Sequence, residues 1–133
     1  GNLVGKNGVA PVDLGKSAQD AMTTSAARTI YFDYDSFAIK PEFQALIENQ
    51  ANFIKADRNR RVAIEGHTDE RGGREYNLAL GQKRAEAVRR VMGLLGVGDS
   101  QVEAVSFGKE KPAVQGSDEA AMAKNRRAEI SYR

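Results

Sequence analysis

The strongest constraint on the fold is a strand pattern that leads through two glycines into a long helical pattern. Residues 60–67, RRVAIEGH, read as a β-strand with Val62 and Ile64 on one side. After the Gly72-Gly73 pair, a helical pattern runs from about residue 76 to residue 95. Its predicted core stripe consists of Ala85, Val88, Met92 and Leu95. A helix with one apolar face has to bury that face, and the preceding strand indicates burial against a sheet.

The chain continues this alternation of strand and helix from residue 29 to its end. TIYFDYDSF, which starts at residue 29, is dense in aromatic and β-branched residues and predicts a strand. Pro41 suits the first turn of a following helix. QVEAVSFG (101–108) and RAEISYR (127–133) predict two further strands, with a short helix over SDEAAMAKN between them. The predicted fold class is an α/β (α+β) two-layer sandwich.

Residues 1–28 differ in composition from the rest of the 133-residue chain. They are rich in Gly, Ala, Ser and Thr, contain no aromatic residue and keep no sustained period. Such a segment buries too little apolar surface to offset its ordering entropy, so we expect a flexible N-terminal linker. A short helix around SAQDAM is compatible with this pattern. Residues 29–133 are then expected to form one domain.

Composition excludes several classes of function. A net charge of +2, from 20 basic and 18 acidic residues, does not predict nucleic-acid binding, since no block of five like charges occurs. The chain has no cysteine, which excludes disulfides, thiolate nucleophiles and Cys-ligated zinc. It has no apolar run of membrane-spanning length. It begins at Gly1 without a signal peptide, as a processed or shortened form would, so an anchor could lie upstream.

The segment EGHTDERGG raises the question of a metal site or a catalytic site. A metal site at His67, Asp69 and Glu70 is disfavoured, because the chain offers no second histidine and no cysteine. We therefore expect no metal and no cofactor, and we expect the His67 ring to hydrogen-bond locally at the end of a strand. Catalysis by Thr68 with His67 is disfavoured because strand neighbours point to opposite faces.

Asp69 and Arg84 form the more informative pair. The Gly-Gly turn lets the chain fold back, so both side chains could face one cleft. An anion and a cation held close together can bind a zwitterion, with the guanidinium gripping a carboxylate in bidentate fashion. Alternatively, they pair with each other as a salt bridge, and spacing alone does not decide between the two. Since partly exposed ion pairs contribute only about 0–1 kcal/mol, we expect their substitution to affect folding less than binding.

The motifs themselves resemble a known family. GHTDERGGREYNLALGQKRAEAV (66–88) is similar to the signature of OmpA-like domains, and the similarity continues through IYFDYDSF, SFGKEKPAV and NRRAEI. It covers roughly residues 29–133. DERGGREYN, GKEKPAV and DEAAMAKNRR most resemble the lipid-anchored branch of the family, the peptidoglycan-associated lipoproteins of Gram-negative bacteria.

This resemblance implies a βαβαβ-type fold with a mixed four-stranded sheet and helices on one face. It also implies a non-catalytic site for the diaminopimelate of peptidoglycan stem peptides. Asp69 would bind the ligand's ammonium group and Arg84 the carboxylate on the same carbon. The other site residues that the family motifs imply are Phe32 and Asp33 through backbone groups, Gly73, Asn77 and Leu80 at the pocket edge, and Arg126 as support.

The resemblance further implies a place in the cell envelope and partners there. The protein would sit at the periplasmic face of the outer membrane through an upstream lipid anchor, with TolB and TolA as partners and His67 as scaffold. One alternative is the peptidoglycan-binding end of an OmpA-type porin or a MotB-type stator. The other is a hydrolase that uses His67 and Asp69.

Overall fold

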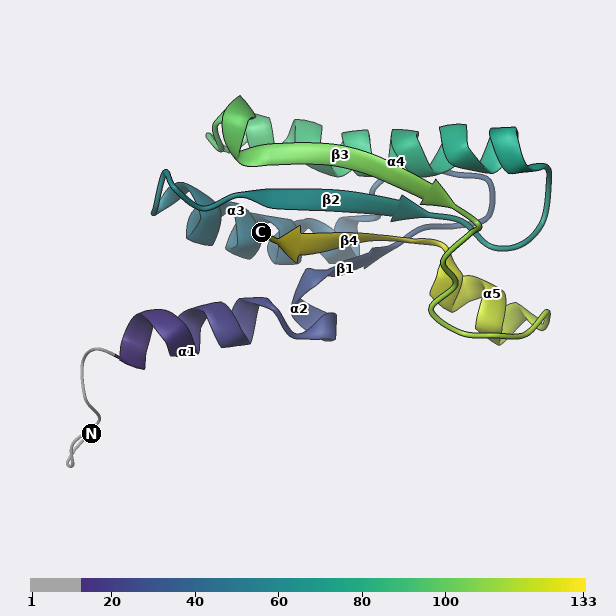
Figure 1. Ribbon diagram of the computed structural model, residues 1–133, viewed down its shortest axis with the longest axis horizontal. Coiled ribbons are helices and arrows are strands. Elements are labelled where there is room, and N and C mark those ends of the chain that lie inside the picture. Colours follow the sequence, from purple (N-terminus) through teal and green to yellow (C-terminus); the bar gives the residue numbers. More distant parts are fainter. Residues whose placement is uncertain (1–12) are drawn as a thin grey trace.

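A mixed four-stranded sheet organises the computed structural model, which describes residues 13–133. The strands are β1 (Thr29–Tyr31), β2 (Val62–His67), β3 (Val102–Gly108) and β4 (Arg127–Tyr132). Their order in the sheet is β1-β4-β2-β3. β2 and β3 run parallel, whereas β4 is antiparallel to β1 and β2 on its two sides (Figure 1). The predicted α/β class and the mixed four-stranded sheet are confirmed.

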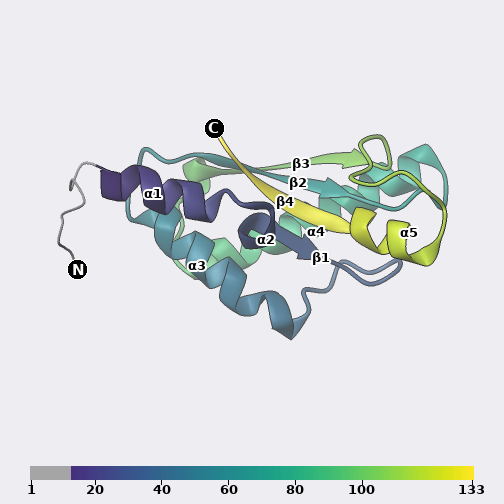
Figure 2. The same cartoon turned by 90° about the horizontal axis from the view of Figure 1, so that it is seen from below.

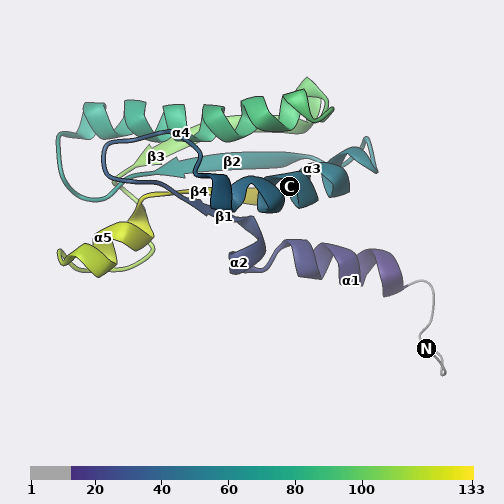
Figure 3. The same cartoon turned by 180° about the vertical axis from the view of Figure 1, so that it is seen from behind.

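Two helices cover one face of this sheet. α3 (Gln44–Lys55), entered through the 3-10 turn η1 (Pro41–Phe43), and α4 (Arg74–Leu94) lie behind the sheet in Figure 1 and in front of it in Figure 3. The buried core lies between these layers, and the predicted stripe on α4 supplies Ala85, Val88 and Met92 to it. The turn η2 (Asp99–Gln101) leads into β3. Among residues 13–133 no helix combines the length and apolar character that crossing a bilayer requires.

A short helix lies at one end of the sheet. α5 (Glu119–Asn125) directly precedes β4 and lies beside the start of that strand (Figure 2). Asp118 caps it, because its carboxylate accepts a hydrogen bond from the amide of Ala121. The cap fixes where the helix begins, and therefore where Arg126 and β4 follow it.

The described residues before β1 include two helices. Residues 1–12 of the expected linker lie outside the described residues, but α1 (Asp13–Met22) and α2 (Ser25–Arg28) are helical. The buried Gln50 side chain donates to the carbonyls of Met22 and Ala27, both at 2.8 Å. Arg28 forms an ion pair with Glu129 at 3.2 Å. These long-range contacts, which composition does not record, tie residues 22–28 to the domain, and α1 contains the short helix that the SAQDAM pattern allowed. The flexible linker stays a prediction.

Two glycines bring α4 into main-chain contact with the sheet. A Cβ on Gly66 of β2 would lie 1.7 Å from the carbonyl oxygen of Gly81 in α4. A Cβ on Gly81 would lie 2.3 Å from the Ser106 hydroxyl and 2.9 Å from the Gly66 carbonyl oxygen. Real Cβ atoms do not approach other atoms so closely, so neither position accommodates a side chain. The helix therefore rests directly on the strand at this point.

We expect Gly81→Ala to lower the free energy of unfolding by about 1–3 kcal/mol, the usual cost of overpacking. Gly93→Ala is the matched control, because it lies in the same helix with no atom near its Cβ position. That control should gain up to about 1 kcal/mol from helix propensity. Urea unfolding of both variants and the wild type measures the difference. Equal stability of the two variants would contradict the main-chain contact.

Candidate ligand-binding pocket

A small pocket opens where β2 ends and α4 begins. Its volume is about 150 Å³. Three segments surround it: the loop after β1, the loop between β2 and α4, and the first three turns of α4. The lining residues are Tyr34, Asp35, Thr68, Asp69, Arg71, Gly72, Tyr76, Asn77, Leu80 and Arg84.

Asp69 supplies the negative charge of the pocket. It is 4% exposed and accepts hydrogen bonds from the Arg71 amide at 3.0 Å, from Arg71 Nη2 at 2.7 Å and from Arg126 Nη1 at 3.3 Å. Burial alone would raise the pKa of this carboxyl group. The hydrogen bonds from Arg71 and Arg126 outweigh burial and hold its pKa below the ordinary value. Asp69 is therefore ionised at neutral pH.

Arg84 supplies the positive charge from a fully buried position. Its Nε donates to the Ser36 carbonyl at 2.8 Å, Nη1 to the His67 carbonyl at 2.9 Å and Nη2 to the Asp33 carbonyl at 3.1 Å. Burial lowers its pKa to about 10, while nearby Asp69 raises it, so the guanidinium remains charged at neutral pH. A guanidinium has five N–H donors, and these carbonyls use three of them.

The two charges do not pair with each other. Among the described ion pairs, Asp69 is bonded to Arg71 and Arg126, and none joins Asp69 to Arg84. Of the two predicted arrangements, the simple salt bridge is therefore wrong. Arg84 is instead held by the carbonyls of Asp33, Ser36 and His67. The part-exposed ion pair on which the expected smaller effect on folding rested is also absent, because Asp69 is 4% and Arg84 0% exposed.

Aromatic side chains form the exposed rim of the pocket. The Arg71 guanidinium lies over the Tyr34 ring, 3.9 Å from its centroid. The Tyr76 hydroxyl donates to the Asp35 carboxylate, and this hydrogen bond is the main cause that raises the pKa of Tyr76. Asp35 has a left-handed backbone with φ of 52°, which turns the loop toward α4. Two segments far apart in sequence thus meet above Asp69 and Arg84.

Of the eight predicted site residues, Asp69, Asn77, Leu80 and Arg84 line this pocket. Phe32 and Asp33 lie one layer behind it, because their carbonyls accept from Arg126 Nε at 3.0 Å and from Arg84. Arg126 itself binds Asp69, as a supporting residue would.

Gly73, the remaining predicted residue, is outside the lining and forms the N-cap of α4. The charged pair thus lines the pocket as expected. The backbone carbonyls of Phe32 and Asp33 do not line it, because they accept hydrogen bonds from Arg126 and Arg84.

Sequence reasoning missed six lining residues. These are Tyr34, Asp35, Thr68, Arg71, Gly72 and Tyr76. Asp35 and Tyr34 stand in the motif FDYDS, where capping and packing are the ordinary interpretation. Arg71 lies two residues after Asp69, which was a usable signal, but the direction of a loop side chain cannot be read from spacing.

The chain is related to known proteins across this whole region. The model of the OmpA family matches residues 31–126. The chain is 48% identical over 114 residues to the peptidoglycan-associated lipoprotein of Pseudomonas aeruginosa, which covers 86% of this chain and 67% of the relative. It is 57% identical to the crystal structure of the peptidoglycan-associated lipoprotein from Burkholderia pseudomallei, with a TM-score of 0.80. That match covers 81% of this chain and 92% of the other.

The chain belongs to the OmpA family.

A more distant member of this fold is also similar. The C-terminal domain of Helicobacter pylori MotB is 25% identical, with a TM-score of 0.73 over 79% of this chain and 83% of that one. The OmpA-family domain described here is thus closer in sequence to the lipoproteins than to this stator protein.

His67 lies behind the pocket of this OmpA-family domain rather than in it. Its carbonyl binds Arg84, but its ring belongs to the sheet face opposite Gly66 and α4, because strand neighbours alternate. The ring is 2% exposed and stacks on Phe107, with centroids 5.5 Å apart. Neither ring nitrogen has a hydrogen-bond partner in the structure. The predicted local hydrogen bond is therefore wrong.

Arg84→Lys should lower the free energy of unfolding by about 2–4 kcal/mol. A lysine ammonium on a flexible stem cannot reach three carbonyls at once, and each buried carbonyl left unpaired costs about 1–3 kcal/mol. Arg89→Lys, at a part-exposed site of the same helix, should stay within about 0.5 kcal/mol of wild type. Urea unfolding tests both. Equal effects would mean that the three carbonyl contacts do not stabilise the fold.

The buried imidazole predicts a pH dependence of stability. Burial, reinforced by Arg127, lowers the pKa of His67 from 6.5 to about 4. Between these values the unfolded chain binds a proton that the folded chain does not. The contribution of the neutral His67 to the free energy of unfolding is therefore fully present above pH 6.5. As the pH falls toward 4, this contribution is lost, and the free energy of unfolding decreases by about 3 kcal/mol.

Unfolding free energies at several pH values in metal-free buffer check this expectation. Wild type should lose more stability than His67→Gln over this window, whereas carboxylates titrate alike in both proteins. Parallel pH profiles would show that the imidazole is not held neutral.

Proposed function

We propose that this chain binds peptidoglycan non-covalently and that its pocket takes the diaminopimelate of a stem peptide. The observation that carries the proposal is the pair of opposite charges, Asp69 and Arg84, which line one pocket without neutralising each other. The relatives, named for their association with peptidoglycan, support the same ligand. Residues 29–133 are the proposed binding domain.

The free end of diaminopimelate suits this pocket chemically. It carries an ammonium and a carboxylate group on one carbon. Arg84 keeps two N–H donors beyond its three carbonyl contacts, which is the number that a bidentate carboxylate contact needs. Asp69 provides the partner for the ammonium. A volume of about 150 Å³ is well below the roughly 300–1,000 Å³ of drug-sized sites, so the pocket takes an end group rather than a whole muropeptide.

Arg71 competes with the ligand for Asp69. Its main chain and side chain both donate to this carboxylate, and Arg126 donates to it as well. Arg71 Nε donates as well, at 3.3 Å, which makes four hydrogen bonds to Asp69. A carboxylate has about four acceptor positions, so an incoming ammonium has to displace part of this set. The Arg71 side chain is 38% exposed, whereas that of Arg126 is 9% exposed. Binding therefore moves the Arg71 guanidinium outward, while Arg126 keeps Asp69 in place.

The affinity for one stem peptide is expected to be moderate. Hydrogen bonds to charged groups contribute about 1.5–3 kcal/mol each, and the displacement of Arg71 offsets part of this gain. A repeating polymer and a chain tethered to a membrane raise the effective concentration. Many weakly bound stem peptides then hold the membrane to the cell wall, and no single tight complex is needed.

The same geometry argues against the hydrolase alternative. A His67–Asp69 pair would need both side chains at one substrate. The His67 ring lies on the sheet face away from α4, while Asp69 lines the pocket against α4. Binding without catalysis is the proposed activity.

In the cell, this binding would connect the outer membrane to the cell wall. The proposal places the domain at the periplasmic face, joined through residues 1–28 to a lipid anchor upstream, with TolB and TolA as protein partners. Identity to the lipoproteins favours this assignment over an OmpA-type porin or a MotB-type stator.

Asp69→Asn should weaken binding of diaminopimelate by about 2 kcal/mol or more, roughly thirtyfold, because the amide cannot neutralise an ammonium. Asp33→Asn is the matched control, since its side chain is exposed and only its carbonyl serves the site. It should bind like wild type. Calorimetric titration with diaminopimelate and a muropeptide measures the affinities, and co-sedimentation with cell-wall sacculi tests the polymer. Undiminished binding by Asp69→Asn would overturn the assignment of the pocket.

A further inference from the structure

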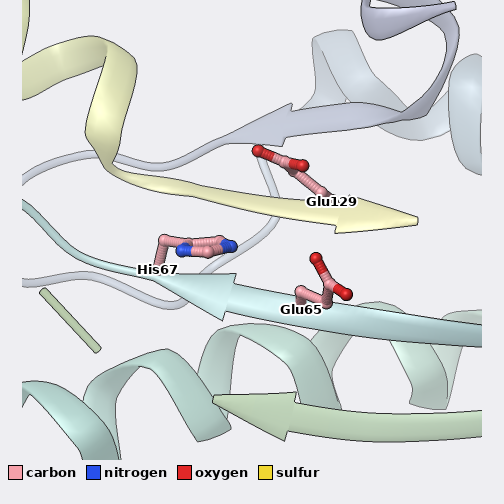
Figure 4. Close-up of side chains that lie close together, drawn as sticks. All are labelled: Glu65, His67 and Glu129. Atoms are coloured by element: carbon pink, nitrogen blue, oxygen red, sulfur yellow. The ribbon is translucent and has the colours of Figure 1, made fainter. Parts of the chain in front are cut away.

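A second cluster of ionisable side chains lies on the sheet face opposite α3 and α4. Glu65 and His67 alternate with Gly66 on β2, and Glu129 comes from the neighbouring strand β4. One ligand atom from each of the three lies within 4.8 Å of the other two. Figure 4 shows the edge of the imidazole turned toward the space between the two carboxylates.

Two features of this cluster favour a bound cation, although Arg127 and Arg28 already offset part of the charge of Glu129. Glu65 stands directly opposite Glu129 in the antiparallel register, and like charges in that arrangement repel each other. His67 is almost completely buried, yet both of its ring nitrogens lack a hydrogen-bond partner in the structure. Buried polar atoms are nearly always paired, so an unpaired imidazole between two carboxylates indicates a missing ligand. A bound cation would both give an imidazole nitrogen a partner and offset the repulsion between the two carboxylates.

We propose that Glu65, His67 and Glu129 bind a divalent transition-metal ion, with zinc as the best match. One imidazole nitrogen, two carboxylate oxygens and a water would complete the tetrahedral set that zinc prefers. Calcium and magnesium are hard cations that prefer ligand sets made of oxygen alone, and the imidazole nitrogen does not fit such a set. A tetrahedral zinc ion with bonds of about 2.0–2.2 Å separates its ligand atoms by roughly 3.4 Å. The ligand atoms, which lie within 4.8 Å of one another, therefore have to close in by up to about 1.4 Å.

The surroundings of Glu129 set the strength of this site. Arg127 and Arg28 each donate to one of its oxygens, and Arg127 is also held by the carbonyls of Asn125 and Lys111. Each carboxylate oxygen has a second lone pair, so Glu129 can bind the metal without releasing both arginines. These cations lower the affinity compared with a site free of positive charge. Glu65 and Glu129 are only partly buried, which leaves a path for the ion.

The site is independent of the proposed peptidoglycan pocket. Its side chains lie on the opposite face of the sheet, and the pocket lining includes none of them. Bound zinc would link β2 and β4 through their side chains in addition to their main-chain ladder. Its direct effect is therefore on stability.

Titration of the tag-free, chelator-treated full chain with zinc chloride tests the proposal by calorimetry and by thermal unfolding. We expect one zinc ion per chain and a higher melting temperature with zinc than with chelator. His67→Gln and Glu65→Gln should each weaken zinc binding at least tenfold. Glu103→Gln is the matched control, because Glu103 is an exposed carboxylate of β3 outside the cluster, and it should bind zinc like wild type.

A second measurement avoids dependence on variants that fold poorly. His67 is the only histidine of the chain, so one set of imidazole signals appears in the NMR spectrum of wild type. These signals should shift on addition of zinc and stay unchanged on addition of magnesium. Unchanged imidazole signals with excess zinc, or zinc binding by His67→Gln equal to that of Glu103→Gln, would overturn the proposal.

Discussion

The guanidinium of Arg84 is the contact on which the binding region depends. It bonds the carbonyls of Asp33, Ser36 and His67, which belong to the loop after β1 and to the end of β2. Two separate parts of the chain therefore take their positions from one side chain of α4. Burial lowers the pKa of this arginine and nearby Asp69 raises it, so the side chain keeps a pKa of about 10 without exposed surface. The same charge that holds the loops together is then offered to a ligand.

Arg126 plays the complementary role for the negative charge. It donates to Asp69 and to the Phe32 carbonyl, and so connects the pocket to the junction of α5 and β4. Both charged groups of the pocket are thus positioned before a ligand arrives, and only the exposed Arg71 has to move. With the proposed function, a site built in this way would distinguish zwitterions from simple cations. A cation alone would displace Arg71 without giving Arg84 a partner.

Local patterns in the sequence predicted the α/β two-layer class and indicated that Asp69 and Arg84 could face one cleft. The period of α4, the strand pattern of β2 and the Gly72-Gly73 turn depend on near neighbours, and together they direct Asp69 and Arg84 toward one pocket. What they could not predict is the partner of Arg84, because the carbonyl of Ser36 is 48 residues away along a loop without period.

The position of Glu129 beside His67 could not be predicted from the sequence for a similar reason. It depends on β4 entering the sheet next to β2, with Glu129 in register with Glu65. Neither strand order nor register follows from the alternation of apolar residues within one strand. The same limit applies to α2, whose order derives from the distant Gln50.

The main-chain contact of Gly66 with Gly81 makes this point the pivot of α4. Arg84 lies three residues from the pivot, about 4.5 Å along the helix axis, whereas Leu94 lies thirteen residues away, about 20 Å. A tilt of the helix about the pivot therefore displaces its far end roughly four times as much as Arg84. Core residues near Met92 can change in size, and α4 can adjust its angle, while the guanidinium hardly moves relative to its carbonyls. The sheet and helix can diverge in sequence at one end without loss of the pocket at the other.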